Sequence, residues 1–319
     1  MSVRIGLGIA QFPSDPAALW RWVDRVERSA VDSIWQSDRL VSPQPSLEAM
    51  SLMAALAART ERLKFGMSVV VISHRDPLVL ARQCATIDFL SGGRLLPAFG
   101  VGSEFAPEWK ATGVSPRGRG ARADEALEIL SRLWSEERVS FEGRHYRYRD
   151  VSIAPRPIQQ PLPLWIGGSS PAAIRRTARI GTGWIAGIQS PDQVAPVVAG
   201  IKRALRESGR SIDPDHYGAG FSFRFGDRSD EIVSRTAKLL GRLSPGLDPE
   251  RYLAVGGAAE VLERIREYRA AGISKFVLRP LATDAADLEA QTERLIEQVL
   301  PAAHALADPA AVEDRAVGT

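Results

Sequence analysis

The chain has 319 residues, of which 45% are hydrophobic, and its formal net charge is +3 at pH 7. No stretch approaches about 18 consecutive apolar residues, so we expect no membrane-spanning helix and no membrane partner. The charge is small and no basic run interleaved with aromatics occurs, which argues against nucleic acid as a partner, and the single cysteine excludes an internal disulfide framework. Together these features predict a cytoplasmic globular protein.

Short apolar runs alternate with amphipathic stretches through the first half of the chain. Asp15 and Ser46 precede two of these stretches and are suited to cap helices there. The expected order is strand 5–10, helix 16–30, strand 33–36, helix 46–60, strand 63–72, helix 77–90 and strand 94–99.

The same alternation continues after a longer break, and it includes one small hairpin over residues 139–148 with Glu142–Gly143 at its turn. Helix and loop are hard to separate over residues 226–255. The expected order is helix 121–134, the hairpin, strand 162–166, helix 172–180, strand 183–186, helix 193–208, strand 217–225, helix 258–271, strand 275–278 and helix 287–306.

Strands that alternate with helices predict a parallel sheet with crossover helices. Eight strand candidates favour a closed sheet over an open one. The expected fold is therefore α/β, a (β/α)8 TIM barrel with loop insertions. Because no Pro-, Gly- or Ser-rich linker divides the chain, we expect one domain over residues 1–308, followed by a disordered tail over residues 309–319.

The active site of such a barrel is built from the carboxyl ends of its strands. These ends carry a polar, glycine-rich set of residues, in which we expect Arg39, His74 and Arg279 to bind substrate. The strand ends are Gln11, Ser37–Asp38–Arg39, Ser73–His74, Gly100–Val101–Gly102–Ser103–Glu104, Gly167–Gly168–Ser169–Ser170, Gly187, Arg224 and Arg279.

The turn from Gly167 to Pro171 is the most specific of these signals. Two glycines let a ligand approach the backbone, two serines can donate hydrogen bonds, and proline opens the helix that follows. The free N–H groups and positive dipole of a helix start suit a phosphate. An ordinary strand-to-helix turn with a capping serine is the alternative.

Asp38 is a candidate acid/base residue or a substrate hydrogen-bond acceptor, and an ion pair with Arg39 is the competing interpretation. The Gly100–Val101–Gly102–Ser103–Glu104 segment lacks the third glycine of a dinucleotide fingerprint, so a plain barrel loop and a ligand contact are both open. The four histidines have no metal-ligand spacing, so we expect no metal. Cys84 lies inside an amphipathic stretch and is expected to be a small core residue.

Taken together, several motifs resemble the luciferase-like superfamily of flavin- and deazaflavin-dependent oxidoreductases. The resemblance runs over residues 3–186 and returns at 256–278. Its marks are Ala58–Arg59–Thr60–Glu61–Arg62–Leu63–Lys64–Phe65–Gly66, Asp76–Pro77, Leu90–Ser91–Gly92–Gly93–Arg94, Gly100–Val101–Gly102, Val139–Ser140–Phe141–Glu142–Gly143, Pro155–Arg156–Pro157, Leu164–Trp165–Ile166–Gly167–Gly168–Ser169–Ser170 and Gly181–Thr182–Gly183–Trp184.

The resemblance implies a set of site residues. Gly168, Ser169 and Ser170 match the turn that binds the cofactor phosphate. The Ser68–Val69 step matches a strand-three bulge, often a cis peptide, that supports the cofactor ring. The resemblance also implies that Gly100, Gly102 and Glu104 line the loop beside the ring, and it makes Asp38 and Glu104 the catalytic candidates.

One departure bears on the chemistry. Many deazaflavin-dependent relatives carry Asp-His where this chain has Asp38–Arg39, and arginine stays protonated and cannot serve as the base. The resemblance implies an enzyme that uses reduced coenzyme F420 or FMN on a small organic substrate, with F420-dependent hydride transfer as the leading reading. The alternatives are an FMNH2-dependent two-component monooxygenase, a non-catalytic flavin-binding protein and, more distantly, a hydrolytic barrel enzyme. A homodimer and a separate flavin or F420 reductase are also implied.

Overall fold

The computed structural model describes residues 3–9 and 15–306, and the chain forms two compact units. Unit 1 comprises residues 1–34 and 186–319, and unit 2 comprises residues 35–185. The single domain expected over residues 1–308 stays a prediction. The expected tail at 309–319 and the first strand end at Gln11 lie outside the described residues.

Parallel strands form the centre of unit 1. β14 lies between β11 and β1, with Phe276 opposite Ala219 and Leu278 opposite Leu7. β12 pairs in parallel with both β13 and β14. The strands are β1 (Arg4–Gly8), β11 (Tyr217–Ala219), β12 (Ser222–Phe225), β13 (Leu253–Gly256) and β14 (Lys275–Pro280).

Helices flank these strands, and α1 begins as predicted, because the Asp15 carboxylate accepts the backbone N–H groups of Ala17 and Ala18. Trp22 of α1 donates to Thr292 of α10 at 2.9 Å, which joins the first and last parts of the chain. The helices are α1 (Pro16–Glu27), α7 (Pro191–Glu207), α8 (Glu231–Leu243), the 3-10 helix η2 (Pro249–Arg251), α9 (Ala258–Ala270), α10 (Ala285–Gln298) and α11 (Leu300–His304).

One prediction for unit 1 is corrected, and one segment that the sequence left open is now assigned. The single strand expected over 217–225 is divided, because β11 pairs with the start of β14 and β12 with its end. Between them the backbone of Gly220 passes so close to β14 that a Cβ there would lie 2.1 Å from the carbonyl oxygen of Val277. The segment 226–255 contains α8, η2 and the strand β13, which the sequence did not separate.

Unit 2 holds two runs of neighbouring strands, β2-β3-β5 and β4-β6-β9-β10, and it begins within β2, at Trp35. The strand expected over 63–72 is divided into β3 and β4 at Ser68–Val69, and the strand expected over 94–99 is divided at Pro97, which has no N–H for a ladder. The strands are β2 (Ser33–Gln36), β3 (Lys64–Met67), β4 (Val70–Val71), β5 (Leu95–Leu96), β6 (Ala98–Gly100), β9 (Trp165–Gly167) and β10 (Gly183–Ile185).

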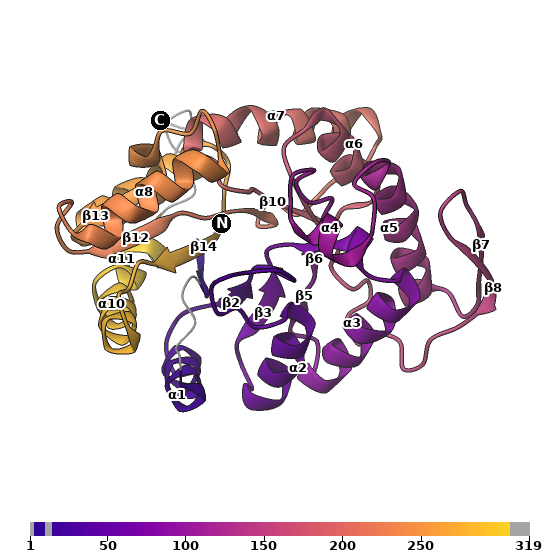
Figure 1. Cartoon of the computed structure of the whole chain (residues 1–319), viewed down its shortest axis with the longest axis horizontal. Helices are drawn as coiled ribbons and strands as arrows, with labels where there is room; N and C mark the ends of the chain where they lie inside the picture. The colour runs from indigo at the N-terminus through magenta and orange to yellow at the C-terminus, as the bar shows by residue number, and fades with distance from the viewer. Residues whose placement is uncertain (1–2, 10–14, 307–319) are drawn as a thin grey trace, which may run out of the picture. The chain divides into compact units, whose positions relative to one another are not determined.

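The helices of unit 2 include one predicted boundary that is wrong. Helix α2 begins at Ala49, capped by Glu48, whereas Ser46 lies before the helix with its hydroxyl 3.4 Å from the Gln36 amide nitrogen. The helices are α2 (Ala49–Arg59), the 3-10 helix η1 (Ile72–His74), α3 (Pro77–Ser91), α4 (Glu108–Thr112), α5 (Arg119–Ser135) and α6 (Pro171–Ile180). α3 and α5 lie side by side (Figure 1).

The predicted hairpin is present as β7 (Val139–Glu142) and β8 (Arg147–Val151), and it packs beside α5 (Figure 1). Glu125 of α5 accepts the backbone N–H groups of three consecutive residues in the turn, at 2.9 to 3.1 Å. One carboxylate therefore fixes the hairpin to the helix.

Large buried side chains fill the core of each unit, with Trp35, Phe65 and Trp165 among those in unit 2. Cys84 lies in α3, completely buried and without a disulfide, which confirms its prediction as a core residue. Burial raises the pKa of its thiol far above the usual range.

Candidate functional site

Asp38 lies just after β2, and its carboxylate is held from three directions. Arg75 donates to both oxygens, at 2.7 and 2.8 Å, and the backbone N–H of Val71 donates at 3.1 Å. The Asp38 side chain is only 2% exposed. The expected alternative, an ion pair, is therefore present, but its partner is Arg75 and not the neighbouring Arg39.

Arg75 also reaches the start of α2. Its second terminal nitrogen donates to Glu48 at 2.8 Å, while Glu48 caps α2 through the N–H of Ser51 at 2.7 Å. Desolvation works to raise the pKa of Glu48, but the Ser51 and Arg75 hydrogen bonds outweigh it and lower the pKa to about 2. Arg75 thus links the end of β2 with the start of α2 through two carboxylates.

The peptide bond between Ser68 and Val69 is cis, as the resemblance implied. The Val69 side chain lies against two glycines on neighbouring strands. A Cβ at Gly100 would lie 2.6 Å from one Val69 methyl carbon, and a Cβ at Gly167 would lie 2.8 Å from the other. Both positions therefore need glycine for as long as Val69 occupies this space.

The Gly167–Ser170 turn has the geometry that the sequence predicted. Gly168 has φ +106°, which side-chain-bearing residues rarely adopt, and its carbonyl accepts the Trp184 indole N–H at 2.8 Å. Ser170 caps α6 by accepting the Ala173 N–H at 3.2 Å, and Pro171 occupies the first helical position. The capping serine of the alternative interpretation is thus present, and it leaves the hydroxyl proton of Ser170 able to donate.

Glu104 follows β6 on an exposed loop, and its side chain is 52% exposed. Among the described residues its partner is Arg119, at 3.4 Å, which is long for a strong pair. The next residue, Phe105, is 87% exposed. Gly102, just after β6, has φ +70°, and a Cβ there would lie 3.0 Å from a Val71 methyl carbon. Both the backbone conformation and the close packing therefore favour glycine at the start of this loop.

His74 is partly buried against helix α4. Its ring lies 4.1 Å from the Trp109 ring, and Nδ1 lies 3.5 Å from the Thr112 hydroxyl. Burial lowers the pKa of His74, although Asp38 and Glu108 oppose this shift. His74 is therefore mainly neutral near pH 7. Glu108 is itself buried, and one of its carboxylate oxygens has no hydrogen-bond partner in the described part of the chain.

Two of the predicted site residues remain, Arg39 and Arg279. Arg39 is exposed, and no hydrogen bond or ion pair joins it to another described residue. Arg279 belongs to unit 1, near the end of β14. The residues that sequence reasoning missed are Arg75, Glu48, Glu108 and Arg119. Arg75 directly follows His74, a predicted site residue, and this adjacency is the one local feature of the sequence that points to Arg75.

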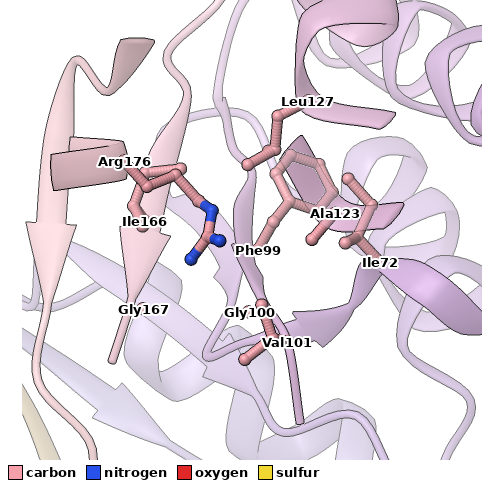
Figure 2. A pocket seen from close by; sticks show the side chains of 9 residues that line it. All are labelled: Ile72, Phe99, Gly100, Val101, Ala123, Leu127, Ile166, Gly167 and Arg176. Atoms are coloured by element: carbon pink, nitrogen blue, oxygen red, sulfur yellow. The ribbon is translucent and has the colours of Figure 1, made fainter. Parts of the chain in front are cut away.

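A narrow pocket with about 180 Å³ of empty volume lies beside this cluster, where β6 and β9 meet α5 and α6. Figure 2 shows Phe99 and Leu127 on one side and the Arg176 guanidinium on the other. Arg176 is already paired with Asp124 at 2.7 Å. Because Arg176, its one charged lining residue, is already paired, we interpret the pocket as a packing gap beside Gly100 and Gly167.

Residues 3–9 and 15–306 contain no group of three or more histidine, cysteine, aspartate or glutamate side chains arranged to hold a metal ion. None of the described helices is both long and apolar enough to cross a membrane.

Residues 3–252 match the family described as luciferase-like monooxygenase. An F420-dependent glucose-6-phosphate dehydrogenase of Intrasporangium calvum is 30% identical over 302 residues, which cover 82% of this chain and 88% of that protein. An uncharacterized protein of Mycobacterium tuberculosis is 36% identical over 169 residues, or 53% of this chain. That match spans 57% of the relative's own length.

The fold has close counterparts among solved structures. An F420-dependent secondary alcohol dehydrogenase in complex with an F420-acetone adduct has a TM-score of 0.81. It is 20% identical, and the match covers 95% of this chain and 99% of that one. This likeness confirms the predicted α/β fold of the (β/α)8-barrel class.

Proposed function

Because the chain belongs to the luciferase-like monooxygenase family, we propose that it is an oxidoreductase that uses reduced coenzyme F420 on a small organic substrate. The similarity to an F420-dependent dehydrogenase over most of both chains supports this choice. The observation that carries the proposal is the packing around the Ser68–Val69 peptide. The methyl groups of Val69 fill the space that a Cβ at Gly100 or Gly167 would need, so this surface carries no side chain from either glycine. A flat ring can lie against such a surface.

The residues of unit 2 fit this cofactor in two places. Gly168, Ser169 and Ser170 would bind its phosphate, because the first turn of α6 offers N–H groups and the positive end of the helix dipole. Ser68 and Val69 would support the ring, with Gly100 and Gly102 beside it. When bound, the reduced deazaflavin supplies a hydride, and the protein contributes binding and orientation.

For proton exchange we propose Glu104 and assign Asp38 to positioning. The Glu104 side chain is 52% exposed and paired only at 3.4 Å, so its carboxylate can reach a substrate atom. Both oxygens of Asp38 are already occupied by Arg75 and Val71. His74, being neutral, would serve the substrate as a hydrogen-bond partner and not as a fixed charge.

The proposal is tested by titrating purified apo-protein with reduced F420 and with reduced FMN, side by side and without oxygen. Tighter binding of F420, with activity that needs no oxygen, is the expected result. Preference for FMN with oxygen consumption would replace the proposal with the monooxygenase alternative that the family description favours. Stable binding of either cofactor without turnover of any substrate would favour a flavin-binding protein.

A matched pair of variants tests the turn. Ser170→Ala and Asp15→Ala each remove a helix cap, at a cost of about 1 kcal/mol in stability, but only Ser170 lies in the cofactor turn. We expect Ser170→Ala to weaken F420 binding about ten-fold, because it loses a hydrogen bond to a charged group. Asp15→Ala should bind F420 normally. Equal affinity in both variants would contradict the assignment.

We also propose a cytoplasmic homodimer, supplied with reduced cofactor by a separate reductase. The apolar residues of α2 around Met50 and Leu56 are buried within unit 2, so they do not offer an interface. Helix α3 instead exposes Val79, Phe89 and Leu90, at 53–58%. Val79 and Leu90 are three turns apart on one side of the helix. Sedimentation of Leu90→Lys tests this: a monomer supports the interface, and an unchanged dimer refutes it.

A further inference from the structure

Arg279 lies near the carboxyl end of β14, and its side chain extends over two glycines of unit 1. A Cβ at Gly8 would lie 2.9 Å from its Cγ and 3.3 Å from its Nε, and a Cβ at Gly220 would lie 3.1 Å from its Nη1. Gly8 ends β1, and Gly220 follows β11, the two strands that flank β14. The Arg279 side chain therefore occupies space that is open only because Gly8 and Gly220 have no side chains.

The guanidinium has little to bind within unit 1. Its one hydrogen bond among the described residues goes from Nη1 to the Tyr252 hydroxyl, at 3.3 Å, and no carboxylate of residues 3–9 or 15–306 forms an ion pair with it. Arg224, in the same unit, shows the contrast. It pairs with Asp230 and Asp287 and donates to the Leu281 carbonyl.

A partly buried arginine without a counter-charge is costly, since its charge has lost water and gained no opposite charge in exchange. Arg279 keeps most of its five N–H donors available, in the planar fork that matches a carboxylate or phosphate. Tyr252 accepts the bond from Arg279, so its own hydroxyl proton is able to donate to the same anion. The Tyr252 side chain is itself 2% exposed, which fixes its position.

We propose that Arg279 and Tyr252 form an anion-binding subsite that selects substrates carrying a carboxylate or a phosphate. The proposal rests on the proposed function, because it names the substrate class of that enzyme. Active sites of (β/α)8 enzymes are built from the carboxyl ends of the strands, and Arg279 lies at that end of β14. The anion would supply the negative charge that the described residues do not.

The first test measures binding of inorganic phosphate and of acetate to the apo-protein by calorimetry at constant ionic strength. We expect at least one of the two anions to bind the wild type, and Arg279→Gln to weaken it about ten-fold or more. Tyr252→Phe should weaken it by a smaller factor, because it removes one donor. Arg21→Gln is the matched control, since it removes an exposed charge from the same unit.

The choice of anion shows which group the subsite takes. Tighter acetate binding would favour carboxylates, and tighter phosphate binding would favour phosphates. Wild-type affinity in Arg279→Gln, or no binding of either anion to the wild type, would overturn the subsite. Binding that survives Arg279→Gln but is lost in Ser170→Ala would belong to the cofactor turn, and it would overturn the subsite as well.

A second variant covers the case in which Arg279→Gln does not fold. Arg279→Lys keeps the charge and loses the fork, so it should bind the anion more weakly than the wild type but more strongly than a neutral residue. Titration with reduced F420 keeps the two proposals separate. Anion binding that depends on Arg279 in a protein that binds no F420 would preserve the subsite and refute the proposed function.

Discussion

Arg75 forms hydrogen bonds to two carboxylates of unit 2, and replacing it with glutamine would leave one of them buried without its charge partner. Asp38, 2% exposed, would keep only the Val71 N–H. Removing one partner of a buried ion pair typically costs about 3–5 kcal/mol. Glu48 is 41% exposed and is screened by water, so its lost pairing adds about 1 kcal/mol at most. We therefore expect Arg75→Gln to lower the free energy of unfolding by about 3–5 kcal/mol.

Equilibrium unfolding in urea measures this loss, provided that the slope of the transition is unchanged. Arg132→Gln is the matched control, because it breaks an exposed pair with Glu136 one helical turn away; such pairs contribute about 0.3–0.5 kcal/mol. The double variant Arg75→Gln with Asp38→Asn should lose less than the sum of the two single variants. A loss in Arg75→Gln as small as that in Arg132→Gln would refute the reasoning.

Three further predictions follow from the same unit. The pKa of Glu48 is lowered from 4.5 to about 2, so its contribution to stability is complete above pH 4.5 and is lost as the pH falls toward 2. The stability of Glu48→Gln, followed by acid unfolding beside the wild type, should therefore lack the part of the pH dependence that falls between pH 4.5 and 2. Gly100→Ala should cost about 1–3 kcal/mol by overpacking against Val69, and urea unfolding should show most of this loss restored when Val69→Ala is added. Glu104→Gln should lower kcat while the affinity for reduced F420, measured by titration, stays the same; a fall in that affinity with unchanged kcat would contradict its role in proton exchange.

The alternation of strands and helices was readable from the sequence because each element carries its own periodicity. The positions at which single strands break could not be predicted in the same way. The division at Ser68–Val69 depends on the space that Gly100 and Gly167 leave on neighbouring strands, and no local pattern records such packing. The strand β13 was missed because its partner β12 lies about 30 residues earlier in the chain, on the far side of α8.

The candidate site shows the same limit. The strand-to-helix turn at Gly168 and Ser170 was predicted because its signals are local: two glycines, a capping serine and a proline at the helix start. Its role in binding a phosphate stays a prediction. For Asp38 the sequence left an ion pair with its neighbour Arg39 open as the competing interpretation. The structure gives Arg75, because parallel strands bring residues distant in sequence to the same edge, where adjacent residues point in different directions.

The buried cysteine described above makes the chain convenient for chemical labelling. Cys84 is the only cysteine, it is completely enclosed in α3, and burial raises the pKa of its thiol, so the native protein offers no reactive sulfur to a maleimide dye. A cysteine introduced at the exposed tip of the loop, at Phe105, would therefore be the single site that accepts a fluorophore. Because Cys84 is buried, a reagent can modify it only when the structure around it opens. The rate of that slow modification therefore measures how often the protein interior opens.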